Sequence, residues 1–239
     1  MSFNLGYNEE FMNIIRDAYN NPLYISNLNE IKKRMRTVYS KCIPQFDDIE
    51  AEILCLILMY LKPSLICEFS PCGGWSSLYM LNTIDIIKMD CILNSFDIID
   101  NCTINIKDDL KDRWLFHLGN VENEYDKFTD EIDFLFIDSD HSAEFAQRYI
   151  TKVLEPLLIS CKKNNKKIFV SVHDVFHRPK PSIEGKLVIE FLEKNNIEYF
   201  SPNNNSHNKE ILSLRNDSNL DTKIIHHAQY NPVIFFILG

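Results

Sequence analysis

The chain has 239 residues, of which 45% are hydrophobic and 25% are charged. This composition is that of an ordinary globular protein, and the length favours one domain with a sizeable core. No apolar run reaches the ~18 residues that a membrane-spanning helix needs, and the first residues lack the basic start and apolar stretch of a secretion signal. The formal net charge of −9 repels polyanions, so nucleic acid is disfavoured as a partner.

The cysteines indicate a reducing compartment. The chain has 7 of them, scattered without a C-x-x-C spacing, and several lie within apolar segments. This usage is typical of reduced core thiols rather than of disulfides or a zinc site, so the expected location is the cytoplasm. The basic run at residues 31–36 fits a solvated helix face at least as well as an anion-binding patch.

In chain order, the first expected elements are helices at 8–20, 28–39 and 47–61, and a breaker at 20–22 separates the first two. Strand candidates follow at 64–69, 91–98, 114–118, 132–138 and 167–172, and helices are expected between them at 75–86, 105–112 and 142–160. Alternation of this kind is typical of βαβ units and a parallel sheet. The chain then continues with a Pro-rich loop at 178–181, a helix at 183–194, a short segment at 197–200, a surface loop at 201–210 and an apolar strand at 233–238.

Two of these strand candidates end in Asp and His. The run I-D-F-L-F-I-D-S-D-H-S (132–142) ends one strand with Asp138, Asp140 and His141, and I-F-V-S-V-H-D (168–174) ends another with His173 and Asp174. Strands that are apolar throughout lie in a sheet covered on both faces, and ligands bind beyond the carboxyl ends of such strands. These side chains are therefore expected to share one active-site rim.

A third signal is the turn after the first strand, where residues 68–77 read E-F-S-P-C-G-G-W-S-S. Small side chains let a ligand approach the backbone, and the following helix N-terminus offers free N–H groups to an anionic group. A tight strand-to-helix turn without any ligand explains the same residues equally well.

Taken in order, this turn, S-F-D-I-I-D (95–100), L-G-N (118–120), F-I-D-S-D-H-S (136–142) and V-H-D (172–174) resemble the class I S-adenosylmethionine-dependent methyltransferases. The resemblance is closest to the macrocin-type branch of small-molecule and sugar O-methyltransferases. It implies an α/β fold with a Rossmann-like, seven-stranded, mostly parallel sheet, helices on both faces and an antiparallel last strand. Residues 46–239 would be the catalytic domain. Residues 1–45 would be an N-terminal helical extension that acts as a lid, selects the acceptor or contacts a second copy in a homo-oligomer.

The resemblance also implies a cofactor site. It places Glu68 under the methionine moiety, Asn120 near the adenine, and Asp97 on the ribose hydroxyls, with Asp100 as the rival for that last role. The small residues Ser70 and Cys72 occupy two positions where the family has Gly. The implied set of contacts to S-adenosylmethionine is Glu68, Ser70, Cys72, Gly73, Gly74, Asp97, Asn120 and Asp138.

For catalysis, the resemblance implies that His141 is the base for an acceptor hydroxyl and that Asp138 and Asp174 are ligands of Mg²⁺. Asp138 thus belongs to the catalytic pair, to the cofactor site and to the metal site. His173 stands where the family often has Glu, and it joins the expected ligands as a nitrogen donor. Magnesium, a softer ion such as Mn²⁺, and a metal-free mechanism all stay open.

The expected function is methyl transfer from S-adenosylmethionine to a hydroxyl of a small molecule or of a sugar or glycan, with no membrane partner. Nitrogen acceptors stay open. One alternative is a metal-dependent hydrolase built on the D-x-D-H and H-D strand ends, which leaves the turn at Glu68 without a role. Another is a non-catalytic binding module with a methyltransferase fold. Arg178, Lys180 and Glu184 follow the fifth strand, where they are candidates for acceptor contact.

Overall fold

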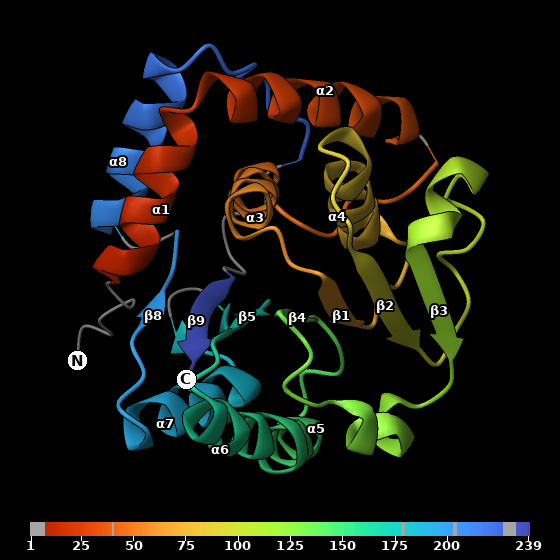
Figure 1. Cartoon of the computed structure of the whole chain (residues 1–239), viewed down its shortest axis with the longest axis vertical. Helices are drawn as coiled ribbons and strands as arrows, with labels where there is room; N and C mark the ends of the chain where they lie inside the picture. Colours follow the sequence, from red (N-terminus) through yellow and green to blue (C-terminus); the bar gives the residue numbers. More distant parts are fainter. Residues whose placement is uncertain (1–7, 40, 178–179, 203–204, 227–232) are drawn as a thin grey trace.

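The computed structural model describes residues 8–39, 41–177, 180–202, 205–226 and 233–239. A seven-stranded sheet in the order β3-β2-β1-β4-β5-β9-β8 forms the centre of the molecule (Figure 1). Its first five strands are parallel, and β9 runs antiparallel between β5 and β8. This confirms the expected Rossmann-like fold with an antiparallel last strand. The strands are β1 (Leu65–Phe69), β2 (Ile92–Asp97), β3 (Trp114–Leu118), β4 (Phe134–Ile137), β5 (Ile168–Val172), β8 (Tyr199–Phe200) and β9 (Ile234–Leu238).

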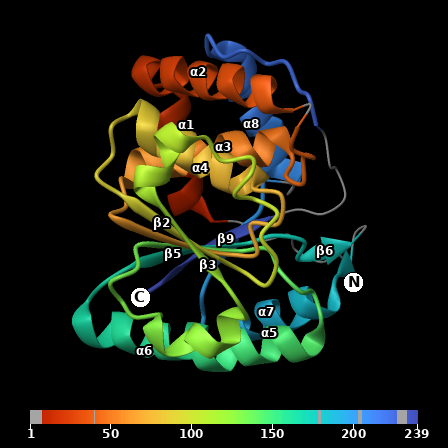
Figure 2. The ribbon, with the colours of Figure 1, turned by 90° about the vertical axis from the view of Figure 1, so that its right-hand side faces the viewer.

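Helices cover both faces of the sheet (Figure 2). One face carries α5 (Ala143–Tyr149), α6 (Glu155–Asn164) and α7 (Ile183–Lys194). The other carries α3 (Asp48–Leu61) and α4 (Trp75–Ile86), with α1 (Glu9–Tyr19), α2 (Pro22–Val38) and α8 (Asn205–Asp217) around them. Because both faces are covered, all four residues of β4 are buried, which explains why its sequence is apolar without alternation.

Helix α3 shows how the sequence produces this arrangement. The Asp47 side chain caps the helix by accepting a hydrogen bond from the Ile49 N–H at 2.8 Å, and Lys62 ends it in the left-handed conformation. Nearly every residue between these caps is buried, because α3 lies between the sheet and the N-terminal helices. A helix that is hydrophobic on all sides is expected only in such a buried place.

The N-terminal helices share one hydrophobic core with α3, α4 and the sheet. Phe11 of α1 stacks on Phe200 with ring centroids 5.8 Å apart, and it also contacts Phe169 and Phe235. Residues 8–39 are therefore packed into the same core as the segment after residue 46. Among the described residues, no helix has both the length and the apolar character needed to cross a membrane.

Acidic partners pair with much of the basic run at 31–36. Lys32 forms a buried ion pair with Glu52 of α3, while Arg34 contacts Asp85 at 2.7 Å and Arg36 contacts Asp221 at 2.6 Å. The run therefore anchors α2 to its neighbours. This is neither the solvated face nor the anion-binding patch that the sequence left open.

Two element predictions were wrong in ways that have a physical cause. Helix α2 begins at Pro22 rather than at residue 28, because Asn21 caps it and Pro is well tolerated in the first helical turn. The segment 201–210, expected as a surface loop, contains the start of α8. The buried face of α8 is formed by His207, Ile211 and Arg215, and two polar residues in that stripe conceal the helical pattern.

Other predicted boundaries needed smaller corrections. The helix expected at 105–112 is a 3₁₀ helix at Asp108–Arg113, and a further 3₁₀ helix covers Val121–Lys127. The helix expected at 142–160 is interrupted by a π-helical segment at Ile150–Leu154 and continues to Asn164. The Pro-rich loop contributes a short hairpin of β6 (Phe176–His177) and β7 (Lys180–Pro181), and its residues 178–179 lie outside the described part of the chain.

Candidate functional site

A cavity of about 530 Å³ opens at the carboxyl ends of the parallel strands. Parallel α/β sheets bind ligands at this edge, because the strand-to-helix loops and the N-termini of the helices meet there. The cavity gathers most of the side chains that the sequence singled out, and its lining includes Ser70, Cys72, Asp97, Asn120, Asp138, His141, His173 and Asp174.

The turn after β1 has backbone φ angles that glycine adopts more easily than other residues. Ser70 and Cys72 have φ angles of 58° and 49°, in the left-handed region, as does Gly74 at 86°. This conformation costs a non-glycine residue on the order of 1 kcal/mol. Hydrogen bonds to the end of β2 hold the turn, since the Ser70 N–H donates to the Phe96 carbonyl at 2.8 Å and the Cys72 N–H to Asp97 Oδ2 at 3.0 Å. Ser70 and Cys72 therefore hold the left-handed backbone conformation that glycine adopts most easily.

Glu68 lies behind the wall of the cavity and does not contribute to its lining. Its fully buried carboxylate accepts hydrogen bonds from the hydroxyls of Ser76, Ser77 and Ser95, each at 2.6 Å. Burial raises the pKa of Glu68, and the three hydroxyl donors oppose that shift. The structure thus shows Glu68 joining β1, β2 and the start of α4, and Ser76 is the member of this network that reaches the cavity.

Asp97 lies in the cavity wall at the end of β2 and is 9% exposed. Its Oδ1 accepts a hydrogen bond from the Ile99 N–H at 3.1 Å, and its Oδ2 accepts the bond from Cys72. Each carboxylate oxygen has lone pairs left for further donors, such as the hydroxyls of a diol. Asp100, the rival, lies outside the lining and accepts from the Thr103 N–H within its own loop.

Beside Asp97 the cavity is partly apolar. Ile98 and Ile99 are 68% and 54% exposed and line the cavity together with Asn120. The Asn120 side chain also accepts a hydrogen bond from the Glu122 N–H at 2.9 Å, which caps the 3₁₀ helix that follows β3. Sequence reasoning missed the two isoleucines, although a pair of apolar residues directly after a strand end was the signal available.

A buried carboxylate holds His141. Glu184 of α7 is fully buried, and its Oε2 lies 2.7 Å from His141 Nδ1, while the Tyr149 hydroxyl donates to Glu184 Oε1 at 2.8 Å. The other ring nitrogen, Nε2, lies 3.3 Å from Asp174 Oδ2 and 3.9 Å from Asp138 Oδ1. Glu184 is therefore too deeply buried to contact an acceptor at the rim of the cavity. Its contact with Nδ1 instead fixes the orientation of the His141 ring. Arg178 lies outside the described residues.

The charges around His141 set its protonation. The pKa of His141 is raised, chiefly by the hydrogen bond with Glu184 and further by the nearby carboxylates of Asp174 and Asp138, against the opposing effect of burial. When the ring is neutral, the carboxylate of Glu184 favours the hydrogen on Nδ1 and leaves Nε2 as the basic atom. That atom is the one nearest Asp174 and Asp138, and all three residues line the cavity.

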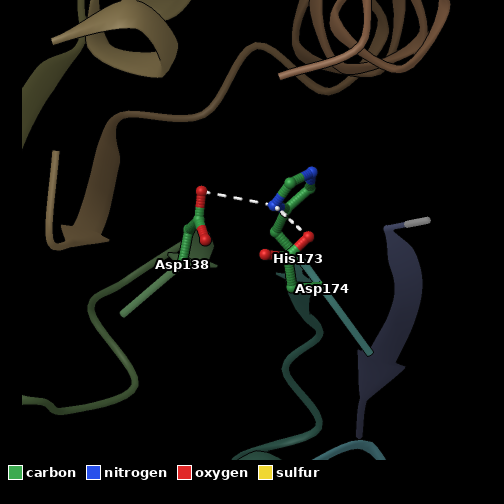
Figure 3. A group of neighbouring side chains, drawn as sticks. All are labelled: Asp138, His173 and Asp174. Carbon is green, nitrogen blue, oxygen red and sulfur yellow. Dashed lines mark ion pairs between the residues drawn. The ribbon is translucent and has the colours of Figure 1, made fainter. Parts of the chain in front are cut away.

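Three side chains could hold a cation next to His141 (Figure 3). Asp138, His173 and Asp174 each offer one ligand atom, and these atoms lie within 4.8 Å of one another. His173 Nδ1 lies 3.3 Å from Asp138 Oδ2 and 3.2 Å from Asp174 Oδ1. Ligand atoms bound at about 2.1 Å to one ion stand roughly 3.0–3.4 Å apart, so this spacing fits one divalent cation. His141 does not belong to this group.

Comparisons with known proteins bear on the fold and on one segment of the chain. Residues 72–161 match the profile of a family described as a methyltransferase domain. The fold is similar to that of the methyltransferase PaMTH1 from Podospora anserina, bound to S-adenosylhomocysteine (15% identity, 99% of this chain and 98% of that chain covered, TM-score 0.55). It is also similar to the O-methyltransferase TomG from Streptomyces achromogenes in complex with S-adenosylmethionine (12% identity, 90% and 89% covered, TM-score 0.53). No curated protein matches the chain in sequence.

At such low identity the structural likeness establishes the fold alone. The chain has the class I methyltransferase fold, and the family match covers the part that runs from the turn after β1 into α6. The matched segment contains Asp97, Asn120, Asp138 and His141, whereas Asp174 lies beyond it.

Proposed function

We propose that this protein is an S-adenosylmethionine-dependent methyltransferase that acts on a hydroxyl of a small molecule, with a sugar or glycan among the candidate acceptors. The observation that carries the proposal is one continuous cavity, which joins the turn and Asp97 at one end to Asp138 and His141 at the other. The fold and the family match support the same reaction class. The acidic lining also suits a cofactor that carries a sulfonium and an ammonium group.

In this proposal the cofactor lies along the turn after β1. Residues 70–74 and the N-terminus of α4 bind the methionine part, so Ser70, Cys72, Gly73 and Gly74 contact it mainly through the backbone. Asp97 accepts from the ribose hydroxyls, and Asn120 with the neighbouring isoleucines surrounds the adenine. Asp138 faces the amino and sulfonium end. Glu68 acts indirectly, since its bond with Ser76 holds the wall in place.

The chemistry needs one base and correct alignment. His141 Nε2 removes the proton from the acceptor hydroxyl, and the oxygen attacks the methyl carbon. A new O–CH₃ bond forms as the bond between sulfur and that carbon breaks, which yields S-adenosylhomocysteine and the methylated acceptor. The proton stays on His141, and Glu184 stabilises the resulting imidazolium.

Asp138, His173 and Asp174 would hold a divalent cation. When bound, such an ion lowers the pKa of an acceptor hydroxyl next to it. The chain's own contribution is to place Asp138 and Asp174 within 3.9 Å and 3.3 Å of His141 Nε2, so that an acceptor held by these carboxylates lies beside the base.

The loop at 41–47 is the part of the N-terminal region that reaches the cavity. Gln45 and Phe46 line it, whereas no residue of α1 or α2 does. Gln45 Nε2 donates to Cys72 Sγ at 3.1 Å, and Phe46 packs edge-on against His173 with ring centroids 5.1 Å apart. We assign acceptor selection in the N-terminal region to this loop, while α1 and α2 support α3.

The two alternatives have weaker support. A metal-dependent hydrolase would use Asp138, His141 and Asp174 but would leave the turn and Asp97 without a role. A non-catalytic binding module is favoured only by Ser70 and Cys72 in place of glycine and by His173 in place of Glu. Ser70 and Cys72 nevertheless adopt the backbone conformation that glycine would supply.

Calorimetry with S-adenosylmethionine in the presence of EDTA tests the proposal. Binding in the micromolar range is the expected result. In a separate assay without EDTA and with added divalent cations, release of S-adenosylhomocysteine is expected with a member of a panel of hydroxylated small molecules and sugars. No binding at millimolar cofactor would rule out the methyltransferase function. Binding without turnover of any acceptor would favour the binding module.

A further inference from the structure

His173, at 3% exposed, is the most buried member of the group formed by Asp138, His173 and Asp174, and it is the only nitrogen donor among these three residues. Its Nδ1 stands at ion-pair distance from Asp138 and Asp174. Even so, neither ring nitrogen makes a hydrogen bond of proper geometry to any residue in the described part of the chain, and the same holds for Asp174 Oδ1. Buried polar atoms are nearly always satisfied, so two such atoms 3.2 Å apart indicate a missing ligand between them.

On the opposite side of the ring, His173 meets a second carboxylate. Glu50, in the first turn of α3, is 2% exposed, and its Oε2 lies 3.5 Å from His173 Nε2. The other oxygen of Glu50 accepts a hydrogen bond from the Val233 N–H at 3.0 Å, which fixes the carboxylate. A carboxylate in this position favours the hydrogen on Nε2 and leaves the lone pair of Nδ1 directed at the cation. This is the arrangement that orients histidine ligands in metal sites.

We infer that the site takes a first-row transition ion such as Co²⁺, Fe²⁺ or Zn²⁺ in preference to Mg²⁺, and that Glu50 is the positioning residue that makes His173 a ligand. This inference rests on the proposed function of the same cavity. Magnesium selects hard oxygen ligands and binds imidazole poorly, whereas an imidazole nitrogen with two carboxylates suits the borderline transition ions. The buried nitrogen of His173 therefore acts as the selective element.

The test compares metal affinities of the cofactor-free protein. Calorimetric titrations with MgCl₂, MnCl₂, CoCl₂ and ZnCl₂ give a dissociation constant for each ion. A higher affinity for Co²⁺ than for Mg²⁺ would not by itself identify a nitrogen ligand, so the ratio of the two constants is compared between wild type and His173→Asp. We expect this all-oxygen variant to reduce the ratio by about tenfold or more.

A spectroscopic signal separates His173 from its neighbour. In the Mn²⁺-loaded protein, electron spin echo modulation from an imidazole nitrogen is expected for wild type and should disappear in His173→Asp. That variant keeps His141, so a signal that persists would come from His141 and would overturn the assignment.

The role of Glu50 is tested by Glu50→Gln, which keeps the size of the side chain. We expect Co²⁺ affinity to fall by about tenfold. Because the change also removes a buried carboxylate next to His173, thermal stability in EDTA should fall as well, and circular dichroism at the titration temperature verifies that the variant is folded. Asp140→Asn is the matched control, because Asp140 lines the same cavity but accepts a hydrogen bond from the Ser142 N–H and does not belong to the ion-binding group. Its metal affinities should equal those of wild type. Equal affinity of Glu50→Gln and wild type would remove Glu50 from the inference.

Three results would overturn the preference for a transition ion. These are equal binding of Mg²⁺ and Co²⁺, an unchanged ratio in His173→Asp, and no binding of any divalent ion at millimolar concentration. The cofactor titration in EDTA is independent of all three. If the cofactor binds but the metal preference is absent, the transition-ion inference fails and the methyltransferase proposal is retained. If the cofactor does not bind, the methyltransferase proposal fails regardless of the metal affinities.

Discussion

Oε2 of Glu184 lies 2.7 Å from Nδ1 of His141, although the two residues are 43 positions apart in the chain. The carboxylate is fully buried, and the Tyr149 hydroxyl occupies its other oxygen. A histidine held in this way has a defined tautomer and a defined ring orientation, both of which a general base needs.

Glu184→Gln should reduce kcat for methyl transfer by at least tenfold, because a glutamine can donate to Nδ1 and so place the hydrogen on the wrong nitrogen. The affinity for S-adenosylmethionine should stay within a factor of two or so, since Glu184 does not line the cavity. Steady-state kinetics and calorimetry measure the two quantities. Glu184→Asp should recover part of the rate, and Tyr149→Phe should cost less than Glu184→Gln. Equal losses of rate and cofactor affinity would make Glu184 a structural residue.

The pKa of His141 should fall in Glu184→Gln. In the metal-free wild-type protein this pKa is raised above the usual 6.5, first of all by the hydrogen bond with Glu184. A raised histidine pKa stabilises the folded state at pH values below 6.5, and that contribution is lost as the pH rises through the folded-state pKa. The variant should therefore lose stability mainly at acidic pH. Titration of the imidazole signal by NMR, together with urea unfolding at pH 5.5 and pH 8.5, measures both effects, and a pKa that does not move would contradict this assignment.

His141→Ala should abolish methyl transfer and leave cofactor affinity nearly intact. In the proposed mechanism the His141 side chain removes the acceptor proton. It contacts the acceptor and does not bind the cofactor. Single-turnover kinetics and cofactor calorimetry on the same preparation decide the outcome. If both rate and affinity collapse together, His141 supports the cavity and another group is the base.

Asp97→Asn should weaken binding of S-adenosylmethionine by about ten- to a hundredfold. Hydrogen bonds from neutral donors to a charged acceptor contribute about 1.5–3 kcal/mol, and the amide loses one acceptor oxygen. Asp100→Asn is the matched control, because Asp100 lies outside the cavity and should leave the affinity unchanged. If the Asp100 variant shows the larger loss, the ribose contact belongs to Asp100.

Glu52→Gln should destabilise the fold without a direct effect on the site. Glu52 is 1% exposed and pairs with two buried cations, Lys32 of α2 and Arg215 of α8, the latter at 2.6 Å. Removing one partner from such a group leaves buried charge uncompensated and costs about 3–5 kcal/mol in the free energy of unfolding. Glu30→Ala, which breaks an exposed pair with Lys33, should cost less than about 1 kcal/mol. Urea unfolding curves measure both, and similar costs would show that the buried network contributes little.

The sequence by itself determined the alternation of the five parallel strands with helices and the strand ends where chemistry was to be expected. Continuous apolar strands that end in Asp and His, such as the one ending at Asp138, can be recognised locally because the pattern depends on a few neighbouring residues. The direction of parallel strands then brings Asp97, Asp138 and Asp174 to one edge of the sheet. The positions of these residues in the cavity wall agree with that expectation.

Only the tertiary structure decided which buried residues hold the side chains of the cavity in place. Glu184 reaches His141 from α7, Glu50 reaches His173 from α3, and Glu68 turns into the protein and away from the cavity. Helix α8 likewise forms where a loop was expected, because its buried polar residue Arg215 finds its partner on α3. Such contacts join residues far apart in the chain, so they are set by the packing of helices on the sheet and leave no periodic trace in the local sequence.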